Sequence, residues 1–207
     1  MAHFVLICKV IWMKTCVNLG VSGNAGTAQW DSETKKQEHY MTVKLRKWNE
    51  ADLDSLVKYA NNINVAKWLT NGFPHPYTHE DGKAFLTMIA NDNPTKIFAI
   101  DVNGEAVGSI GIFPQADIHE RSAETGYWLA EEYWGQGIMT TAIQEIVEYG
   151  FSTFGIVRIF ARPFSANPKS HRVLEKAGFL FEARLKSALF KNGEFMDEII
   201  YAKLKTD

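Results

Sequence analysis

A segment near the middle of the chain, residues 128–142, constrains the fold most: an apolar strand runs into a glycine turn and then a long amphipathic helix. Gly135 and Gly137 lack a Cβ, so the backbone can bend sharply there and a ligand can approach it closely. The first N–H groups of such a helix have no partner within it, and with the helix dipole they favour a phosphate or pyrophosphate. Glycines at such turns are more often plain turn residues, so the phosphate site needs support from the rest of the chain.

The length of 207 residues allows one domain with a sizeable core, plus an extension. The formal net charge of -2 provides no electrostatic basis for binding nucleic acid or an anionic membrane, so we expect neither as a partner. The six histidines show no metal-ligand spacing on an expected helix, because Pro76 separates His75 from His79. We therefore expect no metal site.

Both cysteines, Cys8 and Cys16, lie near the N-terminus, so the rest of the chain can form no disulfide framework, as is usual in a reducing compartment. The apolar run over residues 4–12 is too short to span a bilayer. Residues 18–24 are too polar for the apolar part of a signal peptide. We therefore expect a cytoplasmic protein.

Residues 1–40 differ in composition from the rest of the chain. Between residues 18 and 40 the segment is rich in Gly, Ser, Thr, Asn and charged residues, without sustained periodicity. This composition predicts an N-terminal extension, over residues 1–40, that is flexible or loosely docked. The folded domain is expected over residues 41–207, and Met41 is an alternative start of the protein.

The remaining patterns predict a mixed α/β (α+β) domain with a mostly antiparallel sheet. We expect strands over residues 42–48, 97–102, 106–113, 118–130, 156–164, 180–190 and 195–204. We expect helices that begin at Asn49 and after Thr78, and helices over residues 65–69, 136–154 and 168–176. Asn103-Gly104 and Asn192-Gly193 predict two hairpins.

Three of these helices have apolar stripes that predict the face turned toward the core. In the helix that begins at Asn49 the stripe consists of Leu53, Leu56, Val57 and Ala60. In the helix over residues 136–154 the stripe consists of Ile138, Ala142, Ile143, Ile146, Val147, Gly150 and Phe151. In the helix after Thr78 it consists of Ala84, Phe85, Met88 and Ile89.

Glu124 is a candidate catalytic residue on the strand that leads into the glycine turn. Strand alternation places Glu124, Gly126 and Trp128 on one face of the sheet. A carboxylate at this place could act as a general base. The alternative is a surface glutamate in an ion pair, which is the commoner situation for an acidic residue.

A second candidate lies in residues 166–179, directly after a strand. Asn167 and Pro168 form a good helix start, and capping alone explains both. Ser170 follows in the first turn, where its hydroxyl either donates a proton to a leaving group or bonds locally. In the final hairpin, Asp197 and Tyr201 are expected to serve packing and pairing.

Together these segments resemble the GNAT superfamily of acyl-CoA-dependent N-acetyltransferases, and most closely the branch with the bacterial ribosomal-protein N-terminal acetyltransferases. The resemblance runs in the expected order over about residues 41–205, with matching segments at 123–129, 133–140, 167–179 and 193–197. It implies a twisted, mostly antiparallel sheet flanked by helices, in which a splayed strand pair forms the CoA cleft.

The resemblance also implies acetyl-CoA as acyl donor and co-substrate. The turn would bind the pyrophosphate through backbone N–H groups, and pantetheine would lie in the strand gap. Asn167 would contact the cofactor arm, and Arg172 the nucleotide phosphate. The cofactor-binding residues implied in this way are Leu129, Ala130, Gly135, Gln136, Gly137, Ile138, Met139, Thr140, Asn167 and Arg172.

For the chemistry, the resemblance implies that Glu124 takes a proton from the incoming ammonium, through water, and that Ser170 protonates the departing CoA thiolate. Direct attack in a ternary complex needs no enzyme cysteine. The sequence departs from the wider superfamily at Glu132, where Gln or Arg is frequent. We expect Glu132 to point outward, because the pyrophosphate is held mainly by backbone.

The acceptor would be a primary amine: a protein N-terminal α-amine, as the branch suggests, or a polyamine, an amino acid or an aminoglycoside. Acceptor contacts are expected from Trp128, Phe73 and Tyr77. Two interpretations fit the carboxylates of Glu120, Glu124, Glu131 and Glu132. They form either an acidic cleft that binds a polycation or an ordinary solvated face. The alternative function is a non-catalytic sensor that binds acyl-CoA. A homodimer is expected only by analogy with the family.

Overall fold

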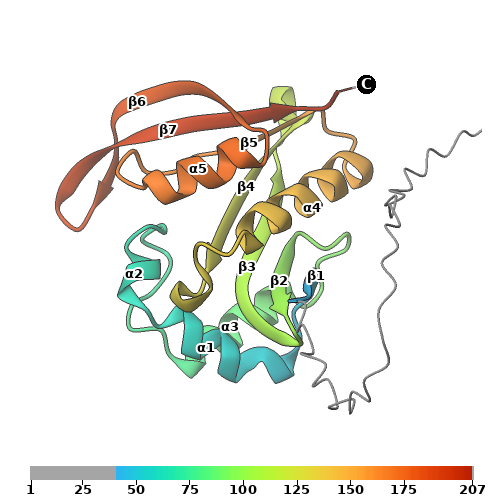
Figure 1. Ribbon diagram of the computed structural model, residues 1–207, viewed down its shortest axis with the longest axis vertical. Coiled ribbons are helices and arrows are strands. Elements are labelled where there is room, and N and C mark those ends of the chain that lie inside the picture. Colours follow the sequence, from blue (N-terminus) through green and yellow to red (C-terminus); the bar gives the residue numbers. More distant parts are fainter. Residues whose placement is uncertain (1–40, 207) are drawn as a thin grey trace, which may run out of the picture. The chain divides into compact units, whose positions relative to one another are not determined.

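The computed structural model describes residues 41–206, and the expectations for residues 1–40 lie outside this range. The described residues form a seven-stranded sheet in the order β1-β2-β3-β4-β5-β7-β6, with helices on both faces (Figure 1). The strands are β1 Val43–Lys47, β2 Ile97–Val102, β3 Glu105–Pro114, β4 Ser122–Leu129, β5 Arg158–Ala161, β6 Leu180–Lys191 and β7 Glu194–Leu204. The helices are α1 Leu53–Ala60, α2 Ile63–Ala66, α3 His79–Ile89, α4 Ile138–Thr153 and α5 Pro168–Lys176.

Neighbouring strands are antiparallel except for β4 and β5, which confirms the predicted mixed, mostly antiparallel sheet. The two predicted hairpins join β2 to β3 and β6 to β7. Asn103 and Asn192 both have φ 53°, and the glycine after each has a positive φ as well. These are the left-handed turn conformations that Asn-Gly favours.

The pairing between β4 and β5 is short, and this creates the opening in the sheet. Only three residue pairs join the two strands, the last being Glu124 with Phe160. Beyond Glu124 the strands part, so within residues 41–206 no strand pairs with residues 125–129 on this side. The predicted splay is therefore present. The strand expected over residues 118–130 begins only at Ser122, because Asp117–His119 forms a single 3-10 turn.

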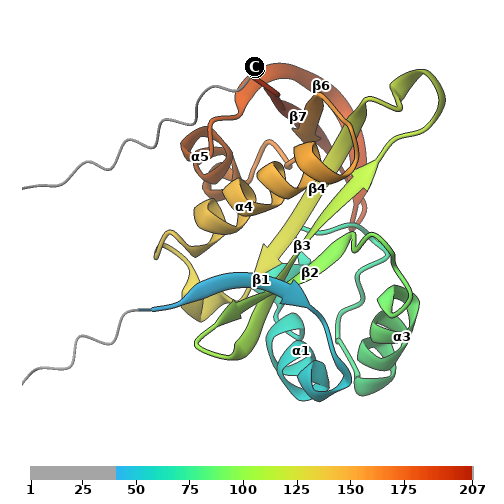
Figure 2. The same cartoon turned by 90° about the vertical axis from the view of Figure 1, so that its right-hand side faces the viewer.

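Figure 2 shows α4 and α5 on one side of the sheet and α1 and α3 on the other. The predicted inward face of α4 is buried, except that Phe151 is half-buried. A separate cluster around Leu56, Ala60 and Tyr77 packs beneath the opposite face. The sheet is thus covered on both sides, and β4 lies between the two packed layers.

The inward face predicted for α3 is wrong in part. Thr78 caps this helix together with Asp81, as expected, but Ala84 and Met88 are exposed. Gly82 takes the buried position instead, and a Cβ there would lie 2.7 Å from Leu53 Cδ1. The close approach of α1 rotates the helix so that its glycine faces inward.

Candidate active site

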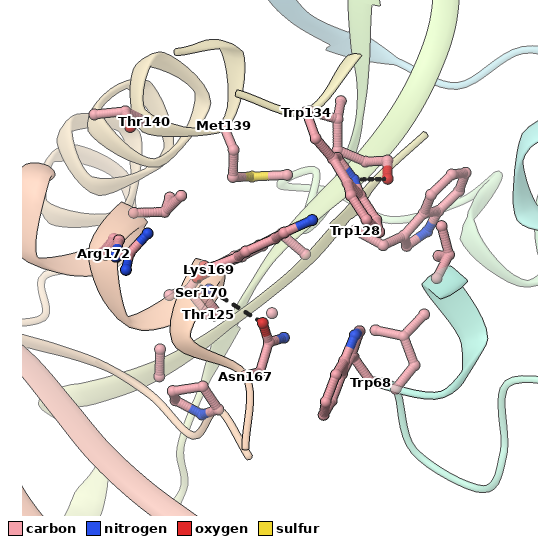
Figure 3. A pocket seen from close by; sticks show the side chains of 18 of the residues that line it. Trp68, Thr125, Trp128, Trp134, Met139, Thr140, Asn167, Lys169, Ser170 and Arg172 are labelled. Atoms are coloured by element: carbon pink, nitrogen blue, oxygen red, sulfur yellow. Dashed lines mark hydrogen bonds between the residues drawn. The ribbon is translucent and has the colours of Figure 1, made fainter. Parts of the chain in front are cut away.

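A cavity of about 650 Å³ opens where β4 and β5 part. Its walls come from α2, the second half of β4, the glycine turn, the start of α4 and the first turns of α5. Figure 3 shows Thr140 and Arg172 on one side of this space and Trp68 and Trp128 on the other. Segments from four distant parts of the sequence thus meet in one place.

Most of the residues singled out from the sequence line this cavity. They are Glu124, Trp128, Leu129, Gly135, Gly137, Ile138, Met139, Thr140, Asn167, Ser170 and Arg172. Ala130 and Gln136 are not among the lining residues. Ala130 is buried, and its N–H continues the ladder to β3. The Gln136 side chain turns back to donate to the Glu132 carbonyl at 2.9 Å.

The glycine turn leaves its backbone open to the cavity. Gly135 and Gly137 have φ 78° and 81°, values that a residue with a side chain rarely adopts. No atom lies within 4 Å of the place where a Cβ would stand at either position. The left-handed Gly137 also explains why α4 begins at Ile138 rather than at the predicted Gln136. The N–H groups of residues 138–140 have no acceptor within the helix, because Thr141 makes its first bond.

Trp134, which the sequence analysis did not single out, shapes the open edge of β4. The Ala130 N–H donates to Val107 on β3, so the alternate residues Leu129 and Tyr127 direct their backbone groups into the gap. The Trp134 indole N–H donates to the Leu129 carbonyl at 2.8 Å. The Leu129 N–H and both backbone groups of Tyr127 also face the gap, where β5 provides no partner within the described strands.

Glu124 is held by an arginine that the sequence analysis missed. Nε and Nη2 of Arg162 each donate to one carboxylate oxygen of Glu124, both at 3.0 Å. This hydrogen-bonded pairing raises the pKa of Arg162. Glu198 on β7 lies 3.9 Å from the same guanidinium, and burial raises the pKa of its carboxyl group. Glu124 therefore forms an ion pair, as the alternative interpretation predicted, but the pair lies in the wall of the cavity.

Ser170 also has an unexpected partner. Its Oγ lies 2.8 Å from the phenol oxygen of Tyr127 on β4, and both residues line the cavity. The Ser170 N–H donates to the Asn167 side chain at 3.3 Å, which is the predicted helix cap. Burial raises the pKa of Tyr127 well above its ordinary value. Strand alternation places Tyr127 on the face of the sheet opposite Glu124. The sequence therefore indicates which way the Tyr127 side chain points, but not that it contacts Ser170.

The aromatic residues expected to contact the acceptor form one cluster, of which only Trp128 lines the cavity. Phe73 lies between Trp128 and Tyr77, with ring centroids 6.2 Å and 5.2 Å away, and Tyr77 is buried. Among the described residues, Phe73 and Tyr77 therefore support Trp128 from behind.

The four glutamates considered for an acidic cleft do not gather at the cavity. Glu120 and Glu132 are exposed and line neither this cavity nor the smaller one beside Glu131. Glu131 accepts hydrogen bonds from Asn62 and Asn64 beside a smaller cavity of about 240 Å³. Only Glu124 faces the larger space, so the cleft is not strongly acidic.

The described residues contain no group of three or more His, Cys, Asp or Glu side chains that could hold a metal ion. Within the same residues, no helix is both long and apolar enough to cross a membrane.

Comparison with known proteins identifies the family. The model of the acetyltransferase (GNAT) domain matches residues 42–180. An uncharacterized N-acetyltransferase of Bacillus subtilis, YnaD, is 31% identical over 173 residues, which are 82% of this chain and 98% of the relative. The ribosomal-protein-serine acetyltransferase of Escherichia coli is 33% identical over 117 residues, 56% of this chain and 65% of that protein.

Among solved structures, the spermidine N-acetyltransferase of Vibrio cholerae, in complex with CoA and spermine, has a TM-score of 0.65. It is 25% identical, over 78% of this chain and 95% of its own. The family match covers more than half of the chain and includes the strand gap, the glycine turn and all of α5. The chain belongs to the GNAT family and is an acetyl-CoA-dependent N-acetyltransferase.

Proposed function

We propose that this enzyme transfers the acetyl group directly from acetyl-CoA to a primary amine, with a protein N-terminal α-amine as the acceptor class. One observation carries the proposal: a single cavity is lined by the candidate base Glu124, the candidate acid Ser170 and residues of the glycine turn and the start of α4. Direct transfer requires the donor and the acceptor to be bound side by side. A cavity of about 650 Å³ has the size of an ordinary small-molecule site.

In this proposal the pyrophosphate binds to the N–H groups at the start of α4. The helix dipole favours an anion there, and no acidic residue occupies the first turn. The pantetheine arm lies in the strand gap and pairs with the free backbone groups of Tyr127. Asn167 contacts the arm, and Arg172 on α5, which lies on the same side of the cavity as Thr140, contacts the nucleotide phosphates.

The proposed reaction moves two protons from the amine nitrogen. Glu124 takes the first from the ammonium through water and releases it to solvent, so that the neutral nitrogen can attack the acetyl carbon. As the tetrahedral intermediate collapses, the C–S bond breaks and its electron pair goes to sulfur. Sulfur receives the proton of the Ser170 hydroxyl. The second proton of the nitrogen returns through water to Ser170.

The charge of the site favours a singly charged acceptor over a polycation. Arg162 offsets the charge of Glu124, and the remaining carboxylates considered from the sequence lie elsewhere. An α-amine, with an ordinary pKa of about 7.7–8.0, also loses its proton more readily at neutral pH than a lysine-like amine of about 10.4. A polyamine is the second candidate, because the Vibrio cholerae neighbour is described with spermine.

The test is the release of CoA thiol from acetyl-CoA at neutral pH with four separate acceptor pools. These are peptides that start with Ser or Ala, polyamines, aminoglycosides and free amino acids. Release with the peptide pool alone is the expected result. Release only with polyamines would show that the acceptor is a polyamine and not a protein N-terminus, while the proposed acetyl transfer would stand. Acetyl-CoA binding without release from any pool would favour a non-catalytic acyl-CoA sensor.

A further inference from the structure

The contact between Tyr127 and Ser170 joins two parts of the site that lie 43 positions apart in the sequence. Tyr127 extends from β4 toward the side of the sheet that α4 and α5 cover, and Ser170 lies in the first turn of α5. Their oxygens are 2.8 Å apart, which is an ordinary hydroxyl–hydroxyl hydrogen bond. The geometry alone allows either hydroxyl to be the donor. The hydrogen between the two oxygens therefore belongs either to Tyr127 or to Ser170.

The two hydroxyls carry two hydrogens, and only one can occupy the shared bond. Among residues 41–206, neither hydroxyl has a second hydrogen-bond partner. If Ser170 donated to Tyr127, its hydrogen would point away from the sulfur of a bound thioester. If Tyr127 donates, the hydrogen of Ser170 is free to point into the cavity. Only the second arrangement leaves Ser170 able to act as the acid.

We propose that Tyr127 is a positioning residue: its O–H donates to Ser170 Oγ and so directs the Ser170 hydrogen at the departing sulfur. The inference rests on the proposed role of Ser170. When the Ser170 proton moves to sulfur, negative charge grows on Oγ, and the Tyr127 O–H is already in place to stabilise it. Tyr127 keeps its own proton throughout, and Ser170 recovers a proton through water.

The burial of Tyr127 suits this role. Burial raises the pKa of Tyr127, so the phenol remains a hydrogen-bond donor over the whole range in which the enzyme is expected to work. An ionised phenolate would instead accept from Ser170 and turn its hydrogen away. The tyrosine is thus a donor that does not titrate near neutral pH.

The test is a double-mutant cycle in kcat at neutral pH with Y127F, S170A and Y127F/S170A. We expect S170A to lower kcat by about 10²- to 10⁴-fold. We expect Y127F to lower it by about 10- to 100-fold, by analogy with groups that orient a metal ligand through a hydrogen bond, with KM for acetyl-CoA unchanged. The double variant should be no slower than S170A alone, because the two residues act as one unit.

Y149F is the matched control. Tyr149 on α4 donates its hydroxyl to the Thr95 carbonyl at 2.8 Å, away from the cavity. Y149F therefore removes one part-buried tyrosine hydrogen bond and should leave kcat unchanged. If Y127F loses no more kcat than Y149F while S170A is impaired, the inference is overturned and the role of Ser170 stands. If S170A itself turns over normally, the proposed acid is overturned, and the inference with it.

A second measurement covers the case in which Y127F fails to fold. 3-Fluorotyrosine at position 127 keeps the ring and the hydroxyl and makes the O–H a stronger donor. We expect it to change kcat when Ser170 is present and to leave kcat unchanged in the S170A background. Equal effects in both backgrounds would show that Tyr127 does not act through Ser170, and would overturn the inference.

Discussion

Replacing Glu124 by glutamine tests the proposed base, because glutamine keeps the shape of the side chain and loses its affinity for a proton. In the structure, Arg162 donates to both carboxylate oxygens at 3.0 Å. Glutamine keeps one acceptor and turns an NH₂ group toward the guanidinium, so one of the two contacts is lost. Because the Glu124 and Arg162 side chains are 28% and 46% exposed, we expect the free energy of unfolding to change by less than about 1 kcal/mol.

The expected effect on the reaction is much larger. A general base contributes about 10²- to 10⁴-fold in rate, which corresponds to about 2.7–5.4 kcal/mol in the activation barrier. The assay is the initial rate of CoA thiol release at saturating acetyl-CoA and acceptor, from pH 7 to pH 10. The deficit of the Glu124→Gln variant should shrink as the pH rises, because the acceptor amine then loses its proton without help.

Glu120→Gln is the matched control, since Glu120 is exposed and lies outside the cavity. It should turn over like the unmodified enzyme at every pH. Normal turnover of Glu124→Gln at pH 7 would refute the role of Glu124 as the base. A loss of turnover that stays constant up to pH 10 would point to a binding or structural role instead.

Three further outcomes are expected. Arg46→Met should lower the free energy of unfolding by about 3–5 kcal/mol in urea titrations, because Arg46 is the ion-pair partner of the buried carboxylates of Asp52 and Asp101. Lys191→Met should cost about 1–3 kcal/mol in the same assay, because the Lys191 ammonium donates to the carbonyl of Ala66 at the end of α2 and to that of Leu69 just beyond it. Burial raises the pKa of Glu198 above 4.5, so its charged form opposes folding and stability is lost as the pH rises through the raised value. Thermal melts of Glu198→Gln from pH 4 to pH 7 should therefore show a stability relative to wild type that increases with pH.

The local chemistry of the chain predicted its turns and most of its elements. Asn-Gly at positions 103 and 192 forces the conformations of two hairpins, and Asn167 with Pro168 starts α5 where expected. These features depend on neighbouring residues alone. The inward face of α3 depends on α1, and no pattern within the helix could show that Gly82 would be the residue in contact.

The residues of the candidate site also fall into those that the sequence could identify and those that it could not. The glycine turn, Glu124 and Ser170 could be identified because they lie in segments with a recognisable order. Arg162 and Tyr127 could not, because only the fold brings each beside its partner, 38 and 43 positions away in the sequence. The contact of Trp134 with the Leu129 carbonyl is local, but no sequence pattern shows which group an indole N–H will reach. Their side chains are also of types that occur throughout any protein, so only the fold distinguishes them.

The short pairing of β4 with β5 also has a consequence for how the protein is made. The four strands β1–β4 are consecutive in the sequence and pair with their neighbours, whereas β5–β7 follow α4 as a second group. During synthesis from the N-terminus, the first group can fold before the second has left the ribosome. The three residue pairs between β4 and β5 can form only afterwards. Glu124 and Tyr127 belong to the first group of strands, and Arg162 and Ser170 follow α4 with the second group, so the candidate site is complete only after the two groups have joined.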